Sequence, residues 1–461
     1  MKNFIKFLKT DVKIINSYFL FAIILIILIS VGYTSYALFS FTKTSTNVIE
    51  GTVGELKKNI DTSGANAPVL ASNMIPVYYD ETNSVWKKSD VSNMDKTNPW
   101  YSYNSTGEYK GMWANAVTVT ATNRTTYLNA APGTTIPMTD INTMWVWIPR
   151  FNAVTPSNYN GGTQAKPNAI DVTFVKQNET AIDAFTFGTK QLSGFWYGKF
   201  EIGGTLASPC TNETCNVSNI VVKPNVSSLR NQKVSSFFYA ARSMEQTGNS
   251  FGFISSEVDT HMSKNNEWGA VAYLTQSIYG RCINSTTCTE IGINNNSSYI
   301  TGYGAPPGSD YNASNGAYNT SLGKDASTTK NIYGIYDMSG GALEYVMGVL
   351  ADPNGKPRSG NSSSWNSGFT GMLKDGTTYT GVSFPDTKYY NNYTGTTYTG
   401  HALTETKNWY SDGANFVNSG YPWFKRGGSR NNITYAGVFC FYRDNGNSGS
   451  DSSSRLVISN K

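Results

Sequence analysis

Residues 331–346 of the chain read NIYGIYDMSGGALEYV, and this stretch says most about the fold. Its adjacent glycines allow a tight backbone path that bulkier residues avoid. Asp337 and Ser339 carry short polar side chains, which can bond the neighbouring amides of such a turn. Leu343 and Tyr345 alternate along the chain after it, as residues on one face of a strand do. The stretch therefore predicts a structural turn that leads into a strand packed against the core.

Three further blocks stand in a fixed order around this stretch. They read GFWYGKFEI at 194–202, DTHMSKNNEWGAVAY at 259–273 and KRGGS at 425–429, and Arg455 precedes the last apolar run. In this order the four blocks resemble the formylglycine-generating (sulfatase-modifying factor) family, whose fold is a variant of the C-type lectin fold. The resemblance covers residues 141–461 and implies an α+β fold rich in ordered loops.

The resemblance also bears on catalysis. Enzymes of this family bind copper through two cysteines after the Arg-Gly-Gly-Ser motif, because soft Cu(I) prefers sulfur ligands. This chain has Asn432 and Gly437 at those positions, and Cys440 stands alone three residues beyond the second. We therefore expect no catalytic residue, no metal and no cofactor. The alternative is an oxidoreductase of this class acting on protein cysteine, which would need a second cysteine close to Cys440 in space.

The same family often binds calcium near the turn at 337–345. The asparagine that it uses is replaced here by Gly341, although Glu344 remains. Because calcium needs several oxygen ligands, this departure argues against a calcium site.

The C-terminal segment from Arg426 onward resembles the variable region of target proteins of diversity-generating retroelements, which use the same scaffold. In those proteins a fixed frame of Gly, Ala and apolar residues holds interspersed positions that are mutated through adenines in a template. The residues themselves support this interpretation, since Phe439 and Phe441 share one strand face while Cys440 and Tyr442 share the other. We expect the Phe face to be buried and the opposite face to be displayed.

The predicted ligand-binding residues lie before, on and after this strand. They are Arg430, Asn431, Asn432, Thr434, Tyr435, Cys440, Tyr442, Arg443, Asp444, Asn445, Ser450, Asp451 and Ser452. Tyr with small polar residues and Arg is the chemistry of antibody paratopes, in which rigid rings combine with adaptable hydrogen bonding. The expected ligand is an extracellular protein or glycan. The alternative is a surface loop rich in Gly, Asn and Ser that binds nothing.

The composition is typical of an extracellular, loop-rich protein, since only 15% of the residues are charged. The net charge is +5, and four lysines lie within the first thirteen residues. No basic stripe appears in the rest of the chain, so we expect no nucleic-acid partner.

The cysteines form two local pairs and one single residue. Cys210 lies five residues before Cys215, Cys282 lies six before Cys288, and Cys440 is left over. Both spacings suit disulfide-closed loops in an oxidising compartment, with reduced thiols as the alternative. A zinc site fits less well, because neither pair is Cys-x-x-Cys and the chain has only two histidines.

The N-terminal segment predicts a membrane anchor. No charged residue occurs from 17 to 42, which is long enough for a helix to cross a bilayer, and four lysines precede it. The positive-inside tendency then leaves the N-terminus in the cytoplasm and the rest outside, as a single-pass cell-membrane protein. The alternative is a signal peptide cleaved near Ala37, which would give a secreted protein.

We expect five segments along the chain. They are a cytoplasmic N-terminus at 1–16, a transmembrane helix at 17–40, a stalk at 41–72, a small β unit at 73–140 and the lectin-like domain at 141–461. Together they predict a non-catalytic, surface-displayed protein of adhesion or recognition. A structural pilus-like subunit is a further alternative, although its usual leader with a glycine cleavage site is not visible.

Overall fold

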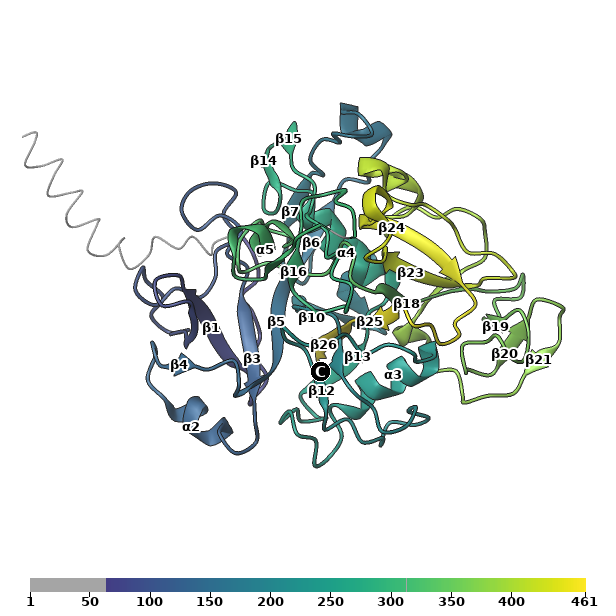
Figure 1. The fold of residues 1–461 in the computed structure, drawn as a ribbon, viewed down its shortest axis with the longest axis horizontal. Helices are drawn as coiled ribbons and strands as arrows, with labels where there is room; N and C mark the ends of the chain where they lie inside the picture. Colours follow the sequence, from purple (N-terminus) through teal and green to yellow (C-terminus); the bar gives the residue numbers. More distant parts are fainter. Residues whose placement is uncertain (1–63, 312) are drawn as a thin grey trace, which may run out of the picture. The chain divides into compact units, whose positions relative to one another are not determined.

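The computed structural model describes residues 64–311 and 313–461 of the protein (Figure 1). The predicted cytoplasmic segment, the predicted membrane helix and most of the predicted stalk lie outside the described residues. Within the described ranges, no helix has the length and apolar character that a bilayer crossing requires. The described chain is a mixed fold in which most regular elements are strands.

An eight-stranded antiparallel sheet forms the larger layer of the fold. Its strands, in spatial order, are β13 (Val258–Met262), β26 (Leu456–Asn460), β10 (Gly194–Gly198), β5 (Ile141–Pro149), β3 (Asn115–Val119), β1 (Ile75–Asp80), β2 (Val85–Lys88) and β4 (Thr135–Ile136). The last strand in sequence, β26, lies between β10 and β13, so the C-terminal strand is paired on both sides within the sheet. Trp145 and Trp147 on β5 are both buried, as expected of a central strand.

The predicted small β unit at 73–140 joins this sheet and does not stand apart from it. Strand β3 pairs with β5, with Val117 opposite Met144, so the sheet continues across residue 140. The described residues from 64 to 461 accordingly belong to one compact unit. The expected boundary at 140/141 falls between β3 and β5, which are paired strands of the same sheet. Without β5, strand β3 would have no partner on that side.

A second, five-stranded sheet carries the C-terminal segment. Its strands are β22 (Asn391–Tyr393), β18 (Leu343–Leu350), β23 (Trp423–Gly427), β24 (Gly437–Asp444) and β25 (Ser452–Ser454). Strand β18 pairs antiparallel with β23 and parallel with β25, and β23 pairs antiparallel with β24. Figure 1 shows β23 and β24 side by side, with β24 drawn in yellow near the end of the chain.

Helices are few and mostly short. They are α2 (Arg124–Asn129), α3 (Val234–Ser243), α4 (Asn265–Thr275) and α5 (Ser321–Asp325), with 3-10 turns η1 (Asn158–Gly161), η2 (Asp183–Phe185), η3 (Thr387–Tyr389), η4 (Thr404–Thr406), η5 (Trp409–Ser411) and η6 (Ile433–Tyr435). Every residue of α4 is buried, and its Trp268 indole donates a hydrogen bond of 2.9 Å to the Val438 carbonyl. Trp268 of helix α4 is therefore bonded directly to strand β24.

The remaining strands form short pairs in the loops. They are β6 (Phe151–Ala153) with β7 (Val172–Phe174), β8 (Thr186–Phe187) with β9 (Lys190–Gln191), β11 (Gly203–Gly204) with β12 (Ile220–Val221), β14 (Cys282–Asn284) with β15 (Thr287–Cys288), β16 (Tyr303–Gly304) with β17 (Gly316–Ala317), and β19 (Arg358–Gly360) with β20 (Gly371–Leu373) and β21 (Thr378–Tyr379). The long Asn- and Gly-rich stretches are therefore ordered loops, as their recurrent aromatic residues predict.

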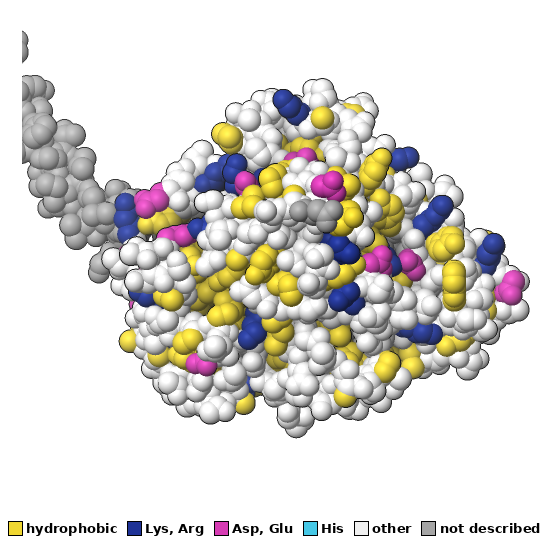
Figure 2. Space-filling view, viewed as in Figure 1, with side chains coloured by type: hydrophobic (Ala, Val, Ile, Leu, Met, Phe, Trp, Pro, Cys, Tyr) yellow, Lys and Arg dark blue, Asp and Glu magenta, His cyan; other side chains and the backbone are white. Residues whose placement is uncertain are grey.

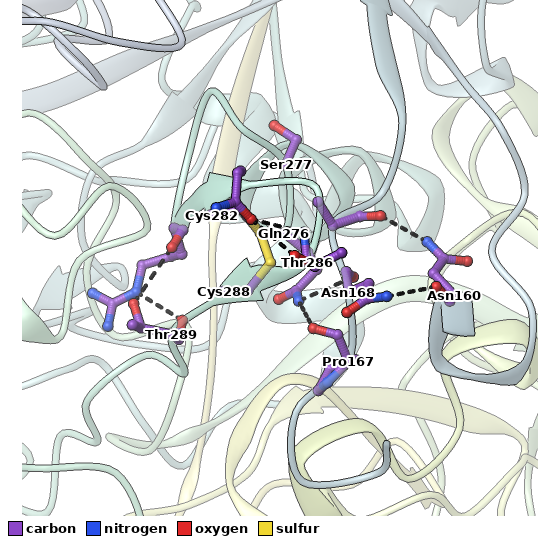
Figure 3. The surroundings of a disulfide bond; sticks show 12 residues. Asn160, Pro167, Asn168, Gln276, Ser277, Cys282, Thr286, Cys288 and Thr289 are labelled. Atoms are coloured by element: carbon purple, nitrogen blue, oxygen red, sulfur yellow. Dashed lines mark hydrogen bonds between the residues drawn. A yellow bond between two sulfur atoms is a disulfide. The ribbon is translucent and has the colours of Figure 1, made fainter. Parts of the chain in front are cut away.

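Two disulfides close local loops, in the two pairs that the spacing predicts. Cys210 is bonded to Cys215, and Cys282 is bonded to Cys288 across the hairpin of β14 and β15. Figure 3 shows Gln276 beside the second disulfide, where its amide donates to the Pro167 carbonyl at 3.1 Å. This contact links the hairpin region to the loop before β7.

The turn at 337–341 is held by buried polar contacts. Asp337 has a left-handed backbone (φ 62°), and its carboxylate accepts hydrogen bonds from the Gly302 amide at 2.9 Å and the Asn294 side chain at 2.8 Å. A Cβ at Gly341 would lie 2.2 Å from the Glu201 carboxylate, so only glycine fits there. The turn is structural, as the sequence predicts.

Candidate ligand-binding face

Strand β24 is anchored from behind by its two phenylalanines. Phe439 and Phe441 are both buried. The ring of Phe439 lies 5.0 Å from that of Trp409, and the ring of Phe441 lies 6.3 Å from that of Phe424. Burying two such rings stabilises the fold by several kcal/mol, roughly 1.5–3 for each. The buried half of the expected arrangement is therefore present.

The opposite side of β24 is not displayed along its whole length, which corrects the expectation for Cys440. Its side chain is completely buried, and among the described cysteines it alone is outside a disulfide. Burial, together with the nearby Asp412, raises the pKa of the Cys440 thiol. The reason is a segment that precedes β23: the Gly413 carbonyl accepts from the Phe441 amide at 2.9 Å, and Asp412 accepts from the Phe439 amide at 2.9 Å. Cys440 cannot contact a ligand from this position.

Two further predicted site residues are also buried. Ser452 lies in β25, which is paired with β18. Its hydroxyl accepts a hydrogen bond of 2.7 Å from the Lys425 ammonium. Asn445 holds the turn after β24, where its side chain accepts from the Asn447 amide at 3.0 Å. Both residues belong to the buried part of the protein that supports the exposed residues of the C-terminal segment, which we call the frame.

Other predicted residues are half-buried and have structural partners. The Asp444 carboxylate accepts from Tyr345 and from Lys425, each at 2.7 Å. Asn432 accepts from the Ser429 amide at 2.6 Å and so fixes the turn before η6. Asp451 is half-buried and accepts from the Ser452 hydroxyl at 2.9 Å.

The residues that reach solvent form the face proper. Asn431, Thr434, Tyr435, Arg443 and Ser450 are exposed, and the Tyr435 side chain keeps 58% of its surface. Tyr442 and Arg430 are half-buried. These are seven of the thirteen predicted residues. Their side chains are placed to contact a ligand without breaking a hydrogen bond that holds the fold. We call these seven residues the C-terminal face.

An open groove of about 660 Å³ runs along part of the C-terminal face. Thr434, Tyr435 and Tyr442 line it from one side. Burial raises the pKa of Tyr442 to about 12, so its hydroxyl stays protonated and can donate a hydrogen bond at neutral pH. The groove therefore brings three predicted residues together, two of them aromatic.

The other side of the groove comes from residues that the sequence did not single out. They are Gln164 and the segment 408–415, including Asn408, Ser411 and Asn415. Three residues of this segment have left-handed backbones, Asn408 (φ 62°), Tyr410 (φ 55°) and Ser411 (φ 76°). Such conformations are costly for residues other than glycine and cluster at functional sites, but nothing in the local sequence predicts them.

A second group of residues joins the face from distant loops. The Arg430 guanidinium lies 5.1 Å from the ring centre of Tyr299 and 5.8 Å from that of Tyr311, while Arg230 lies 4.0 Å from Tyr299. Arg443 lies 6.0 Å from the ring of Tyr421 in the same way. Arginine stacked on an aromatic ring is held in place and keeps donor groups free.

The metal sites of the resembling family do not fit these residues. The copper ligands would be Asn432 and Gly437, which offer no thiolate, and the described cysteines other than Cys440 are in disulfides. The calcium position at Gly341 is filled by the Glu201 carboxylate, and Glu344 is paired with Arg455.

The surface around the face carries little charge. Figure 2 shows Lys and Arg side chains scattered in small groups among uncharged ones, without a continuous positive stripe. This view agrees with the low charged content of the sequence.

No known protein-family model matches the chain, and no curated protein matches it. The resemblance to the formylglycine-generating family therefore stays a prediction.

Solved structures similar to the chain include Treponema denticola variable protein 1, with 14% identity over 68% of this chain and 95% of that one, and a TM-score of 0.25. They also include two variants of the Major Tropism Determinant. The U1 variant has 12% identity over 87% of each chain and a TM-score of 0.28. The M1 variant has 14% identity over 88% of this chain and 87% of that one, and a TM-score of 0.26.

Proposed function

We propose that this protein is a non-catalytic recognition protein of the cell surface. A C-type-lectin-type scaffold displays the C-terminal face, which binds a protein or glycan on another cell, a phage or a host. The exposed positions of this face are those that a diversity-generating retroelement would exchange. The N-terminal segment 17–40 holds the scaffold at the membrane with the face outside.

One observation carries this proposal: an exposed set of Tyr, Arg and small polar side chains is mounted on a rigid aromatic base. Phe439 and Phe441 fix β24 from behind, while Tyr435 and Tyr442 border an open groove in front. Rigid Tyr rings supply contact area at low entropic cost, and neighbouring hydroxyl and amide groups supply hydrogen bonds. Tyr and Arg are also the residues that dominate binding energy at interfaces.

The frame and the face differ in a way that suits exchange of residues. The exposed side chains of Asn431, Thr434 and Ser450 are small and polar and lie at the surface. Their replacement would leave the buried rings untouched. Substitutions at exposed sites usually change stability by less than about 0.5 kcal/mol.

A binding experiment tests the proposal. The full chain, displayed on a cell or purified in detergent, is offered to a panel of candidate host and neighbouring bacterial cells, and bound cells are counted. We expect Tyr435→Ala to reduce binding at least tenfold, because an anchor ring is lost. Trp365→Ala is the control, since Trp365 is an exposed aromatic outside the groove. Equal binding by wild type and Tyr435→Ala would contradict the proposal.

Sequencing the same locus in sibling strains tests the diversification. Substitutions traceable to template adenines should be confined to exposed positions between 430 and 453 and should spare Phe439 and Phe441. A nearby reverse-transcriptase gene is expected. Uniform drift along the chain would remove this part of the proposal.

A further inference from the structure

Two arginines share one tyrosine ring at the border of the C-terminal face. Arg230 lies 4.0 Å and Arg430 lies 5.1 Å from the ring centre of Tyr299. Tyr311 adds a second ring, 5.8 Å from Arg430, and it is 43% exposed. Segments that lie far apart in sequence thus place two positive charges on one aromatic platform.

The backbone around this cluster is fixed. Tyr299 has a left-handed conformation (φ 57°), and its carbonyl accepts from the Ser228 amide at 3.0 Å. The Arg230 guanidinium donates to the Ser450 carbonyl at 2.6 Å, and the Arg430 amide donates to the Gly341 carbonyl at 2.8 Å. Strained backbone that the surroundings hold in place is frequent at binding sites.

The two positive charges of the cluster are not neutralised within the part of the chain that the structure describes. Other arginines, such as Arg242 and Arg455, form ion pairs with carboxylates, whereas neither Arg230 nor Arg430 does so among the described residues. Within the same ranges, the buried Nε of both residues and the buried Nη1 of Arg430 have no hydrogen-bond acceptor, and Nη1 of Arg230 donates to the Ser450 carbonyl. Two like charges held together without a counter-ion attract an anion.

We propose that Arg230 and Arg430 bind the anionic group of an acidic saccharide. The inference rests on the proposed function, because it names the chemical class of ligand for the same face. A guanidinium carries its N–H donors in one plane, and their spacing matches the paired oxygens of a carboxylate or sulfate. The saccharide's carboxylate or sulfate ester would supply the missing negative charge.

The neighbouring side chains favour a sugar over an acidic peptide. Tyr311, whose exposed ring lies against Arg430, adjoins the C-terminal face, which offers the small polar groups of Asn431, Thr434 and Ser450 and the exposed ring of Tyr435. Thr434 adjoins the Tyr311 loop, since a Cβ on Gly308 would lie 3.2 Å from its methyl group. Aromatic rings pack on the C–H face of a sugar, while hydroxyl and amide groups bond its hydroxyls.

The experiment uses the full chain and three soluble saccharide probes, 3′-sialyllactose, lactose 3′-sulfate and uncharged lactose, with a glutamate-rich peptide measured beside them. Binding is measured by calorimetry or surface plasmon resonance at low and physiological salt. We expect both acidic probes to bind at least tenfold more tightly than lactose, and their affinity to fall as salt rises. The comparison of the sialylated and sulfated probes distinguishes a carboxylate from a sulfate as the preferred group.

Variants test the role of the two arginines. Arg230→Gln and Arg430→Gln should each weaken the acidic probes about tenfold or more and leave lactose unchanged. Arg230→Lys and Arg430→Lys keep the charge but lose the fork, so an intermediate loss is expected. Arg358→Gln is the control, because Arg358 is a half-buried arginine outside the C-terminal face. Thermal unfolding of each variant shows that it is folded.

Three outcomes would overturn the inference. They are equal affinity for lactose and the acidic probes, acidic-probe affinity that both Gln variants leave unchanged, and tighter binding of a glutamate-rich peptide with the same arginine dependence. If the acidic probes fail while cell binding remains sensitive to Tyr435→Ala, the inference is wrong and the proposed function stands. If cell binding is insensitive to Tyr435→Ala, the proposed function fails on its own test.

Discussion

Arg455 and Arg430 lie in the same C-terminal segment, yet the molecule uses them in opposite ways. Arg455 is fully buried, donates to both carboxylate oxygens of Glu344 and bonds the Gly198 carbonyl at 2.9 Å. Arg430 lies at the surface against tyrosine rings and forms no ion pair with a described residue. All the charge of Arg455 is paired inside the fold, whereas the half-buried Arg430 has no carboxylate partner among the described residues. The frame should therefore be intolerant of substitution and the face tolerant.

The largest expected effect is at Arg455. Replacing it by leucine leaves Glu344 buried without its partner, close to the carboxylates of Asp337 and Glu201. Breaking a buried ion pair from one side costs about 3–5 kcal/mol. Chemical denaturation should show this loss for Arg455→Leu, and less for the double variant Arg455→Leu/Glu344→Leu. Equal losses in the single and double variants would show that the pair is not what holds this region.

A smaller effect is expected where the frame meets the face, at Gly437. A Cβ there would lie 2.1 and 2.2 Å from the two oxygens of Asp412, which holds the Phe439 amide. Gly437→Ala should destabilise the protein by about 1–3 kcal/mol, the usual range for overpacking. Gly395→Ala is the matched control, because the nearest atom to its Cβ would be 3.6 Å away. A neutral Gly437→Ala would mean that Asp412 moves aside easily.

The frame should also respond to pH through Glu201. Burial, with Asp337 and Glu344 nearby, raises the pKa of this carboxyl well above its ordinary value of 4.5. The folded state then favours the protonated form, so its stabilisation is complete below pH 4.5 and is lost as pH rises toward the raised pKa. Every tenfold difference in proton affinity between the folded and unfolded states changes the free energy of unfolding by about 1.4 kcal/mol. Denaturation curves across this range should show the decline, and Glu201→Gln should flatten it.

Much of the buried frame could be predicted from the sequence, because the sequence patterns that indicate it are local. The alternation of Phe439 and Phe441 predicted the buried side of β24, and the paired spacing of the other four cysteines predicted both disulfides. Hydrophobic periodicity reports burial against whatever covers it, so these features need no knowledge of the partner.

The groove and the contacts of Arg430 with distant loops could not be predicted from the sequence, because the residues that form them lie far apart in the chain. Cys440 was expected at the surface, since alternation alone cannot reveal that 412–415 runs along the outer edge of β24. Tyr299 and Arg230 reach Arg430 from loops with no local signal. The continuation of the sheet across residue 140 was hidden for the same reason, since the pairing of β3 with β5 is not visible in either strand alone.

The smallest effect on stability is expected on the face, and there many changes should add up to little. Asn431, Thr434, Tyr435, Arg443 and Ser450 are all exposed. A variant with Asn431→Ser, Thr434→Asn, Tyr435→Ser, Arg443→Ser and Ser450→Asn should unfold within about 1 kcal/mol of wild type. The single variant Cys440→Tyr, on the same strand segment, should cost more, because a large ring cannot enter a filled interior.

This pair of variants decides whether the segment is a frame with an exchangeable face. If the five exposed replacements preserve the unfolding free energy while ligand binding is abolished, the exposure of a position, and not its residue type, determines whether the fold tolerates a substitution there. If the five-residue variant loses as much stability as Cys440→Tyr, the exposed groups are themselves part of the frame. In that case exchange at these positions would damage the fold, and the segment could not serve as a variable binding surface.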